Sequence, residues 1–146
     1  MDILRMTQAH ISKVAELEAA CFSMPWSENT IAGELSNPLS LWLVAVEDGV
    51  VAGYIGSQTV LGEADMMNVA VSANHRRKGI GRALVNALID RLRENNAYSL
   101  TLEVRASNDA AIRLYDSMGF EMVGCRPGYY TAPKEDALIL RKEWQV

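Results

Sequence analysis

A short segment rich in positive charge and glycine, Arg76-Arg77-Lys78-Gly79-Ile80-Gly81-Arg82, is the densest chemical signal in the chain. Its four cationic side chains and two glycines lie between a run typical of a strand and the start of a helical apolar repeat. The first N–H groups of a helix lack partners and carry the positive end of its dipole, and glycines let a phosphate approach the main chain. The segment therefore predicts an anion site, although a basic turn that only begins a helix would have the same residues.

Two common phosphate-binding motifs do not fit this segment. The chain has no GxxxxGK[ST] pattern, which excludes a P-loop. The dinucleotide fingerprint GxGxxG would need a glycine at position 84, where Leu84 stands. Neither nucleotide-binding motif is therefore predicted.

The composition is that of a globular chain. Its 146 residues are 49% hydrophobic and 22% charged, which excludes collagen-like, low-complexity and largely disordered proteins. This length suits one domain covering residues 1–146. The N-terminal residues mix charges through what would have to be the apolar part of a signal peptide, so we expect a cytoplasmic protein.

The charge and the cysteine pattern exclude several kinds of partner. A net charge of −4 argues against a broad basic face that holds nucleic acid. The longest apolar run, Leu41 to Val46, is far too short to span a membrane. Cys21 and Cys125 lie outside any CxxC spacing and the two histidines form no cluster, so we expect neither a disulfide framework nor a metal site.

The elements that position the basic segment follow a mixed α/β order. Strands are expected around residues 3–6, 41–49, 50–60, 63–72, 99–106, 120–124 and 137–140, with Asp48-Gly49 as a hairpin turn. Helices are expected from the cap Thr7 to about residue 21, over 27–35, from 79 to about 95, and over 107–118. A meander followed by strand, helix, strand, helix predicts a single α/β domain on a mixed, mostly antiparallel sheet flanked by helices.

The R-x-x-G-x-G pattern directly after the strand Met66 to Val71 resembles the acetyl-CoA site of the GCN5-related N-acetyltransferase (GNAT) superfamily. Three further segments, LEVRASN with AI-x-LY and GF at 102–120, GYY with EDALIL at 128–140, and CFSMPWS at 21–27, are similar to its RimI-type subfamily. That subfamily acetylates the N-terminal alanine of a small-subunit ribosomal protein. The resemblance covers nearly the whole chain and implies the GNAT fold, acetyl-CoA as cosubstrate and no metal.

The resemblance gives the basic segment and its preceding strand a role in holding coenzyme A. In such enzymes the loop amides bind the pyrophosphate and the strand pairs with the pantetheine arm. The implied cofactor-binding residues are Val69, Ala70, Val71, Arg76, Arg77, Lys78, Gly79, Ile80, Gly81, Arg82 and Asn108. The N–H of Val71 would stabilise the oxyanion formed at the thioester carbonyl. Asn108 is a cofactor contact by resemblance, and a helix cap by its position alone.

Glu103 and Tyr115 are the proton-transfer residues that the resemblance implies. Glu103 falls on the strand face opposite Leu102 and Val104, which by itself describes an ordinary solvated glutamate. In similar enzymes the matching glutamate removes a proton from the acceptor ammonium, directly or through water. Tyr115 shares an apolar helical face with Met118 and could be a core residue, but its hydroxyl can also donate to the departing thiolate.

The acceptor is expected to enter between the Trp26 region and a loop at Gly128 to Tyr130. Trp26, Tyr129 and Tyr130 are candidate walls of this groove, and each could instead be an ordinary packed aromatic. Acidic side chains could attract a basic peptide or simply be solvated: Glu63, Asp65, Glu135 and Asp136. Neither cysteine has a histidine placed beside it by motif, so direct transfer in a ternary complex is expected.

The expected partner is the N-terminus of a small-subunit ribosomal protein, with no membrane or direct nucleic-acid contact, and the oligomeric state is open. Two other functions fit the sequence less well. One is acetylation of a small-molecule amine. The other is a noncatalytic acyl-CoA-binding or ribosome-assembly module, which would not need the chemistry of Glu103 and Tyr115.

Overall fold

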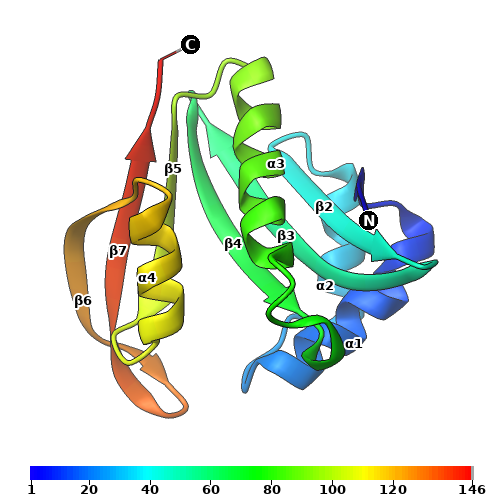
Figure 1. Ribbon diagram of the computed structural model, residues 1–146, viewed down its shortest axis with the longest axis horizontal. Helices are drawn as coiled ribbons and strands as arrows, with labels where there is room; N and C mark the ends of the chain where they lie inside the picture. The colour runs from blue at the N-terminus through cyan, green and yellow to red at the C-terminus, as the bar shows by residue number, and fades with distance from the viewer. Residues whose placement is uncertain (146) are drawn as a thin grey trace.

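The computed structural model describes residues 1–145, which fold around one mixed sheet of seven strands (Figure 1). The strands are β1 (Asp2–Arg5), β2 (Ser40–Glu47), β3 (Val50–Val60), β4 (Glu63–Val71), β5 (Ser99–Arg105), β6 (Glu121–Thr131) and β7 (Lys134–Glu143). Their order across the sheet is β1-β2-β3-β4-β5-β7-β6. Every neighbouring pair is antiparallel except β4 and β5. The mixed, mostly antiparallel sheet is therefore confirmed.

The β2–β3 hairpin forms where its turn sequence predicts it. Asp48 and Gly49 both have positive φ angles, 52° and 78°, as a two-residue turn between twisted strands requires. The turn brings Glu47 opposite Val50 and starts a ladder that runs to Ser40 and Gln58. This hairpin, together with β1 and β4, forms one of the two antiparallel parts of the sheet, and β5, β7 and β6 form the other.

Helices cover the sheet unequally. Their bounds are α1 (Ile11–Cys21), α2 (Glu28–Gly33), α3 (Ile80–Glu94) and α4 (Asp109–Ser117), with short 3-10 turns at Gln8–His10, Glu34–Ser36 and Ala73–His75. Helices α3 and α4 pack on one face of the sheet, and α1 and α2 lie on the other (Figure 1). The buried residues between the sheet and helices α1 and α2 end at Ala70 of β4, so this core includes no residue of β5, β6 or β7. The same face of β5, β7 and β6 is thus left open.

The apolar stripe that predicts α3 consists of Ile80, Ala83, Leu84, Ala87, Leu88 and Leu92, of which the two alanines are only partly buried. The buried residues of the helix are Ile80, Leu84, Val85, Leu88, Ile89 and Leu92. They pack on alternate residues of the sheet, among them Leu43, Ile55 and Leu100, none of which is exposed. Burial of such side chains contributes about 1.5–3 kcal/mol each before the entropy of ordering is subtracted. This packing fixes the start of α3 relative to the end of β4.

The structure corrects three predictions of detail. Thr7 precedes a 3-10 turn, and α1 itself begins only at Ile11. The last two strands are much longer than residues 120–124 and 137–140. The expected loop at 128–130 therefore lies within β6, next to an irregularity in the register between Arg126 and Tyr130. No helix within residues 1–145 is long and apolar enough to cross a membrane.

Replacing Gly56 by alanine is expected to destabilise the fold. A Cβ at Gly56 would overlap the indole ring of Trp42, which is buried and cannot move away freely. Overpacking of this kind costs about 1–3 kcal/mol. Urea denaturation of Gly56→Ala would measure the loss. Gly33→Ala is the matched control, because a Cβ there meets nothing within 4 Å and alanine favours helix α2. Equal stability of the two variants would contradict this prediction.

Candidate active site

The parting of β4 from β5 creates the site. Within residues 1–145 the two parallel strands share three registered pairs, from Glu63 with Ser99 to Asp65 with Thr101. Beyond them β4 continues along β3 as far as Val71, whereas β5 continues along β7 as far as Arg105. Because each strand keeps a partner on one side only, the backbone N–H and C=O groups that face the gap have no strand partner.

A bulge in β4 lies at the start of the gap. Gly56 of β3 pairs with Asn68 and Ser57 pairs with Met66, so Met67 is an extra residue in β4. A bulge of this kind bends the strand and increases its local twist. It turns the end of β4, residues 69–71, away from β5. Val69 and Val71 pack toward the α3 side and Ala70 packs toward α1.

The basic segment forms a pocket at the end of β4. The pocket has a volume of about 210 Å³ and is lined by Val71, by residues of the segment 75–82 and by Leu114 of α4. Arg77 and Gly79 have positive φ angles of 64° and 76°, which curls the main chain before α3. Gly79 is the N-cap of α3 and offers no side-chain cap, so the first N–H groups of the helix are left to a ligand or water.

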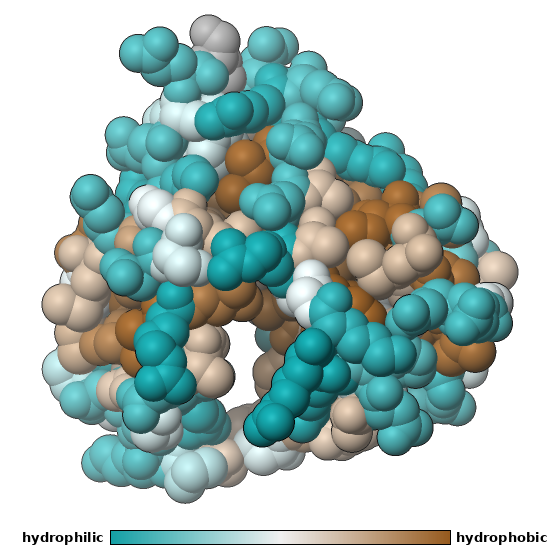
Figure 2. Space-filling model, viewed as in Figure 1, coloured by the Kyte–Doolittle hydropathy of each residue, from teal (hydrophilic) through white to brown (hydrophobic). Residues whose placement is uncertain are grey.

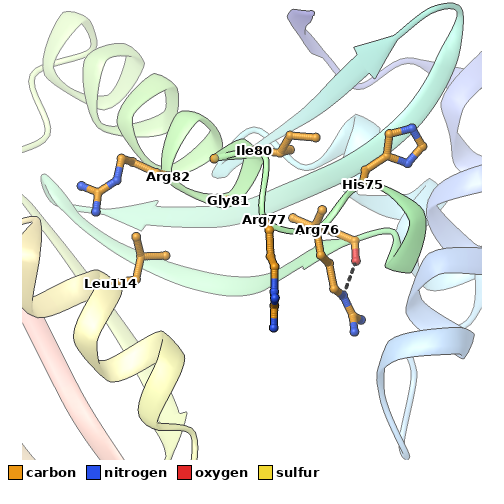
Figure 3. Close-up of a pocket in the computed structure, with 9 residues that line it drawn as sticks. His75, Arg76, Arg77, Ile80, Gly81, Arg82 and Leu114 are labelled. Carbon is orange, nitrogen blue, oxygen red and sulfur yellow. Dashed lines mark hydrogen bonds between the residues drawn. The ribbon is translucent and has the colours of Figure 1, made fainter.

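The arginines of this segment are held in different directions (Figure 3). Arg76 and Arg77 project on the same side of the loop, and Arg76 Nε donates to the carbonyl of Val71 at 3.3 Å. Arg82 points toward α4, where its Nη2 donates to the hydroxyl of Ser117 at 2.7 Å. His75 points away from both groups. The concave main chain, the helix N-terminus and the cations together suit a pyrophosphate.

Asn108 caps α4. Its Oδ1 accepts a hydrogen bond from the N–H of Ala111 at 3.2 Å. The cap is one of the two roles that its position allows. Contact with a cofactor stays a prediction for Asn108.

Tyr115 places its ring in the core and its hydroxyl toward β4. The residue is 5% exposed, and its ring packs edge-on against Phe120 at a centroid distance of 5.3 Å. Its hydroxyl lies 3.9 Å from the sulfur of Met66, the residue at which β4 leaves β5. Burial raises the pKa of Tyr115 to about 12. The phenol therefore stays protonated, as a hydrogen-bond donor must, throughout the neutral and mildly alkaline range.

Glu103 lies on the opposite, open face of the sheet. Its Oε1 is 3.7 Å from Nη2 of Arg126 on β6. Hydrogen bonding to Glu103 raises the pKa of Tyr129, and burial followed by the Glu103 charge raises the pKa of Tyr130. Burial, followed by the carboxylates of Glu103 and Glu63, also raises the pKa of Asp65. Carboxylates and phenols thus gather around one point together with the guanidinium of Arg126, so a cationic guest at Glu103 would compete with Arg126 for this carboxylate.

The segment that follows α1 contacts the turn between β6 and β7, so the part of the molecule that ends with β4 and the part that begins with β5 touch a second time. Ser23, which follows α1, donates its hydroxyl to the carbonyl of Ala132 at 2.6 Å. Thr131 of β6 lies 3.5 Å from the sulfur of Met24. Figure 2 shows the result, an opening through the molecule between the half that carries α4 and the half that carries α3. Tyr115 lies in the core on the α3 and α4 side of the sheet, and Glu103 lies on the opposite face.

The aromatic residues expected to bind an acceptor border the open face. Trp26 follows α1 and packs against Trp42, with ring centroids 5.5 Å apart. Tyr129 and Tyr130 pack edge-on at 5.1 Å, and Arg105 covers the ring of Tyr130 at 4.2 Å. Arg105 also donates to the carbonyl of Pro133 at 2.9 Å, which ties β5 to the β6–β7 turn. Rotations of these rings are therefore restricted before any acceptor binds.

Sequence reasoning missed a buried polar cluster next to the site. Glu18 of α1 is 0% exposed and accepts hydrogen bonds from Tyr54 and Asn68. The available signal was its spacing, because Glu18 falls on the apolar stripe that contains Ile11 and Val14. The partners could not be inferred, since they lie 36 and 50 residues farther along the chain.

Comparison with known proteins identifies the family. The sequence pattern described as "Acetyltransferase (GNAT) family" matches residues 11–120. This chain belongs to the GNAT family of acetyltransferases. The match includes the parted strands, the basic segment, Glu103 and Tyr115, whereas Tyr129, Tyr130 and the β6–β7 turn lie beyond it.

Individual GNAT relatives are similar over most of the chain. The [ribosomal protein bS18]-alanine N-acetyltransferase of Escherichia coli K12 is 41% identical over 126 residues, covering 85% of this chain and 84% of that protein. The N-alpha-acetyltransferase RimI of Mycobacterium tuberculosis is 35% identical over 144 residues, covering 94% and 89%. The crystal structure of the E. coli S18-alanine enzyme superposes with a TM-score of 0.91 at 36% identity, covering 99% and 94%. The GNAT fold is therefore confirmed, and the chain is an acetyltransferase.

Replacing Gly79 by alanine is expected to weaken binding of coenzyme A. GNAT acetyltransferases use acetyl-CoA, and a left-handed alanine would strain the loop that precedes α3 by about 1–2 kcal/mol. Calorimetric titration with coenzyme A would measure the change. Gly49→Ala is the control, because that glycine has a similar φ angle and equally open surroundings but lies in a distant hairpin. If both variants bind like the unaltered protein, the loop does not hold the cofactor.

Proposed function

We propose that this enzyme transfers the acetyl group of acetyl-CoA to the α-amine of a protein N-terminus, and that its acceptor is the N-terminal alanine of a small-subunit ribosomal protein. The observation that carries the proposal is the opening at the parting of β4 and β5, with Tyr115 on one face and Glu103 on the other. The names of the E. coli and M. tuberculosis relatives support the choice of acceptor.

The α3 side of the opening suits coenzyme A. Its phosphates would lie in the pocket at the start of α3, near Arg76, Arg77 and Arg82. Its pantetheine arm carries amides, and these would pair with the free edge of β4 at residues 69–71 in place of the missing strand. Asn108 and the segment 78–81 would complete this side. The acetyl group would lie along this edge of β4, where the N–H of Val71 would face its carbonyl oxygen.

The open face suits the acceptor amine. A protonated α-amine would be drawn to Glu103 and Asp65, and the rings of Tyr129 and Tyr130 would border it. Trp26 would form the opposite wall. Because Ser23 and Met24 meet the β6–β7 turn, an extended chain end passes through the opening more readily than an internal segment of a folded protein.

Direct attack in a ternary complex would use both faces of the sheet, with the cofactor on the α3 side and the acceptor amine on the open face. Glu103 takes a proton from the ammonium, directly or through a water, and the freed lone pair attacks the thioester carbon. The N–H of Val71 donates to the oxyanion that develops on the carbonyl oxygen. As the carbon–sulfur bond breaks, Tyr115 donates its proton to the departing sulfur, and the phenol is reprotonated by the second proton that the nitrogen loses when it becomes an amide. The products are an N-acetylated chain end and the coenzyme A thiol, and the proton on Glu103 returns to solvent.

Mass spectrometry of peptides tests the proposal. We expect a peptide copying the N-terminus of the host's small-subunit ribosomal protein eighteen to gain one acetyl group, about 42 Da, when incubated with acetyl-CoA and the enzyme. A second peptide with a blocked N-terminus and an internal lysine is expected to stay unmodified. Acetylation of small amines in place of the free peptide would support the small-molecule alternative. Binding of acetyl-CoA with no transfer to any amine would support the noncatalytic module.

Substitution of Glu103 and Tyr115 is expected to separate their roles by pH. Glu103→Gln should slow transfer about a hundredfold below pH 7 and less above about pH 8, where the α-amine already loses its proton unaided. Tyr115→Phe should lower kcat by a factor that is constant from about pH 6 to pH 10, because a phenol with a pKa of about 12 does not ionise there.

Initial rates measured across this pH range give both profiles, and the KM for acetyl-CoA should hardly change in Tyr115→Phe. Glu143→Gln is the control for Glu103→Gln, since Glu143 pairs with Arg141 at the far end of β7. Wild-type profiles in both variants would remove both residues from the chemistry.

A further inference from the structure

Glu18 is a buried carboxyl group that the proposed chemistry does not use. It is 0% exposed and lies on the apolar side of α1, with Val14 and Leu17. Among residues 1–145 it forms no salt bridge with a lysine, arginine or histidine. A buried carboxylate without a cation is a costly way to stabilise a core, because an apolar side chain of similar size would avoid its desolvation.

Three hydrogen bonds satisfy this carboxyl group. Its Oε1 accepts from the hydroxyl of Tyr54 at 2.5 Å and from Nδ2 of Asn68 at 2.6 Å. Its Oε2 accepts from the backbone N–H of Trp26 at 2.9 Å. The bond from Trp26 uses the main chain, so it fixes the path of the segment after α1 and not only a side chain.

Two of the three donors border opposite sides of the proposed active site. Trp26 belongs to the expected acceptor wall, and its ring packs against Trp42. Asn68 belongs to the bulge of β4, directly before the residues expected to hold the cofactor. The third donor, Tyr54, lies behind them in β3, fully buried and stacked on Trp42 at 6.0 Å. Among residues 1–145, Glu18 is therefore the one side chain that hydrogen-bonds to both Trp26 of the proposed acceptor wall and Asn68 of β4.

We propose that Glu18 is a positioning residue for acetyl transfer, which sets the distance between the acceptor wall and the bulge of β4. The proposal rests on the proposed function. Transfer requires the position of the amine relative to the thioester carbon to be set within a few tenths of an ångström, because small misplacements lower the rate sharply. A carboxyl group with two acceptor oxygens can bridge the two segments rigidly, which a single apolar contact cannot do.

Three variants separate positioning from stability. Glu18→Gln keeps the size of the side chain but replaces one acceptor oxygen by a donor NH₂ group, so it cannot accept from all its present partners. Asn68→Ala removes the link to β4 and leaves the link to Trp26. Tyr54→Phe is the matched control, because it removes one hydrogen bond to the same carboxyl group and keeps both the stacked ring and the backbone pairing of this residue with Ala70.

The experiment measures kcat and KM for the free-amine peptide, the dissociation constant of acetyl-CoA, and the melting temperature of each variant. We expect Glu18→Gln to lower kcat/KM for the peptide about tenfold or more, with acetyl-CoA binding changed less than about twofold. Asn68→Ala should lower kcat about tenfold with little change in the KM for peptide. Tyr54→Phe should melt earlier yet keep both kinetic constants.

Each remaining outcome has a definite meaning. If Glu18→Gln and Asn68→Ala melt earlier but react like the unaltered enzyme, Glu18 serves stability alone and the inference is wrong. If Tyr54→Phe loses as much activity as Glu18→Gln, the effect follows general loosening and the inference is again wrong. If Glu18→Gln does not fold, Asn68→Ala decides. If the unaltered enzyme binds acetyl-CoA but modifies no peptide, the proposed function fails first and this inference falls with it.

Discussion

The organisation of this protein depends on unpaired backbone between β4 and β5. Parallel strands in a sheet normally continue their ladder, because each N–H and C=O left unpaired inside a protein is costly. Here the ladder ends after Asp65 and Thr101 because β4 stays with β3 and β5 stays with β7. The bulge at Met67 and the packing of α4 hold the strands apart. The cost is offset when a ligand with its own amides takes the place of the missing strand.

The separation of β4 from β5 also separates the arginines at the start of α3 from the carboxylates of the site. The net charge of −4 describes the whole surface, whereas the start of α3 gathers Arg76, Arg77 and Arg82 around one pocket. On the other face, Glu103 lies near Asp65, two phenols and the guanidinium of Arg126. In the proposed reaction an anionic cofactor and a cationic acceptor would therefore approach from different faces and meet at the opening. This separation suits direct transfer, because neither reactant has to cross the binding site of the other.

Local patterns carried most of what the sequence predicted. The stripe of α3, the turn at Asp48-Gly49 and the basic segment each depend on residues close together in the chain, and each was placed correctly. The extent of β6 was not, because its burial hardly alternates and Pro127 and Gly128 are poor strand formers. The end of the β4–β5 ladder and the bonds of Glu18 are set by tertiary contacts, which leave no periodic trace in the sequence.

Selectivity among acceptors is concentrated where the two halves touch again. The contacts of Ser23 with Ala132 and of Met24 with Thr131 join a segment after α1 to the β6–β7 turn, 107 to 109 residues away. These contacts border the opening, so the two segments determine what can pass while the loop before α3 does not. The fold and the cofactor loop are shared by GNAT enzymes with unrelated acceptors. Under the proposed function the acceptor would therefore be selected by the segments CFSMPWS and GYY, and Glu18 connects the first of these segments to the strand where the acetyl group is expected to lie.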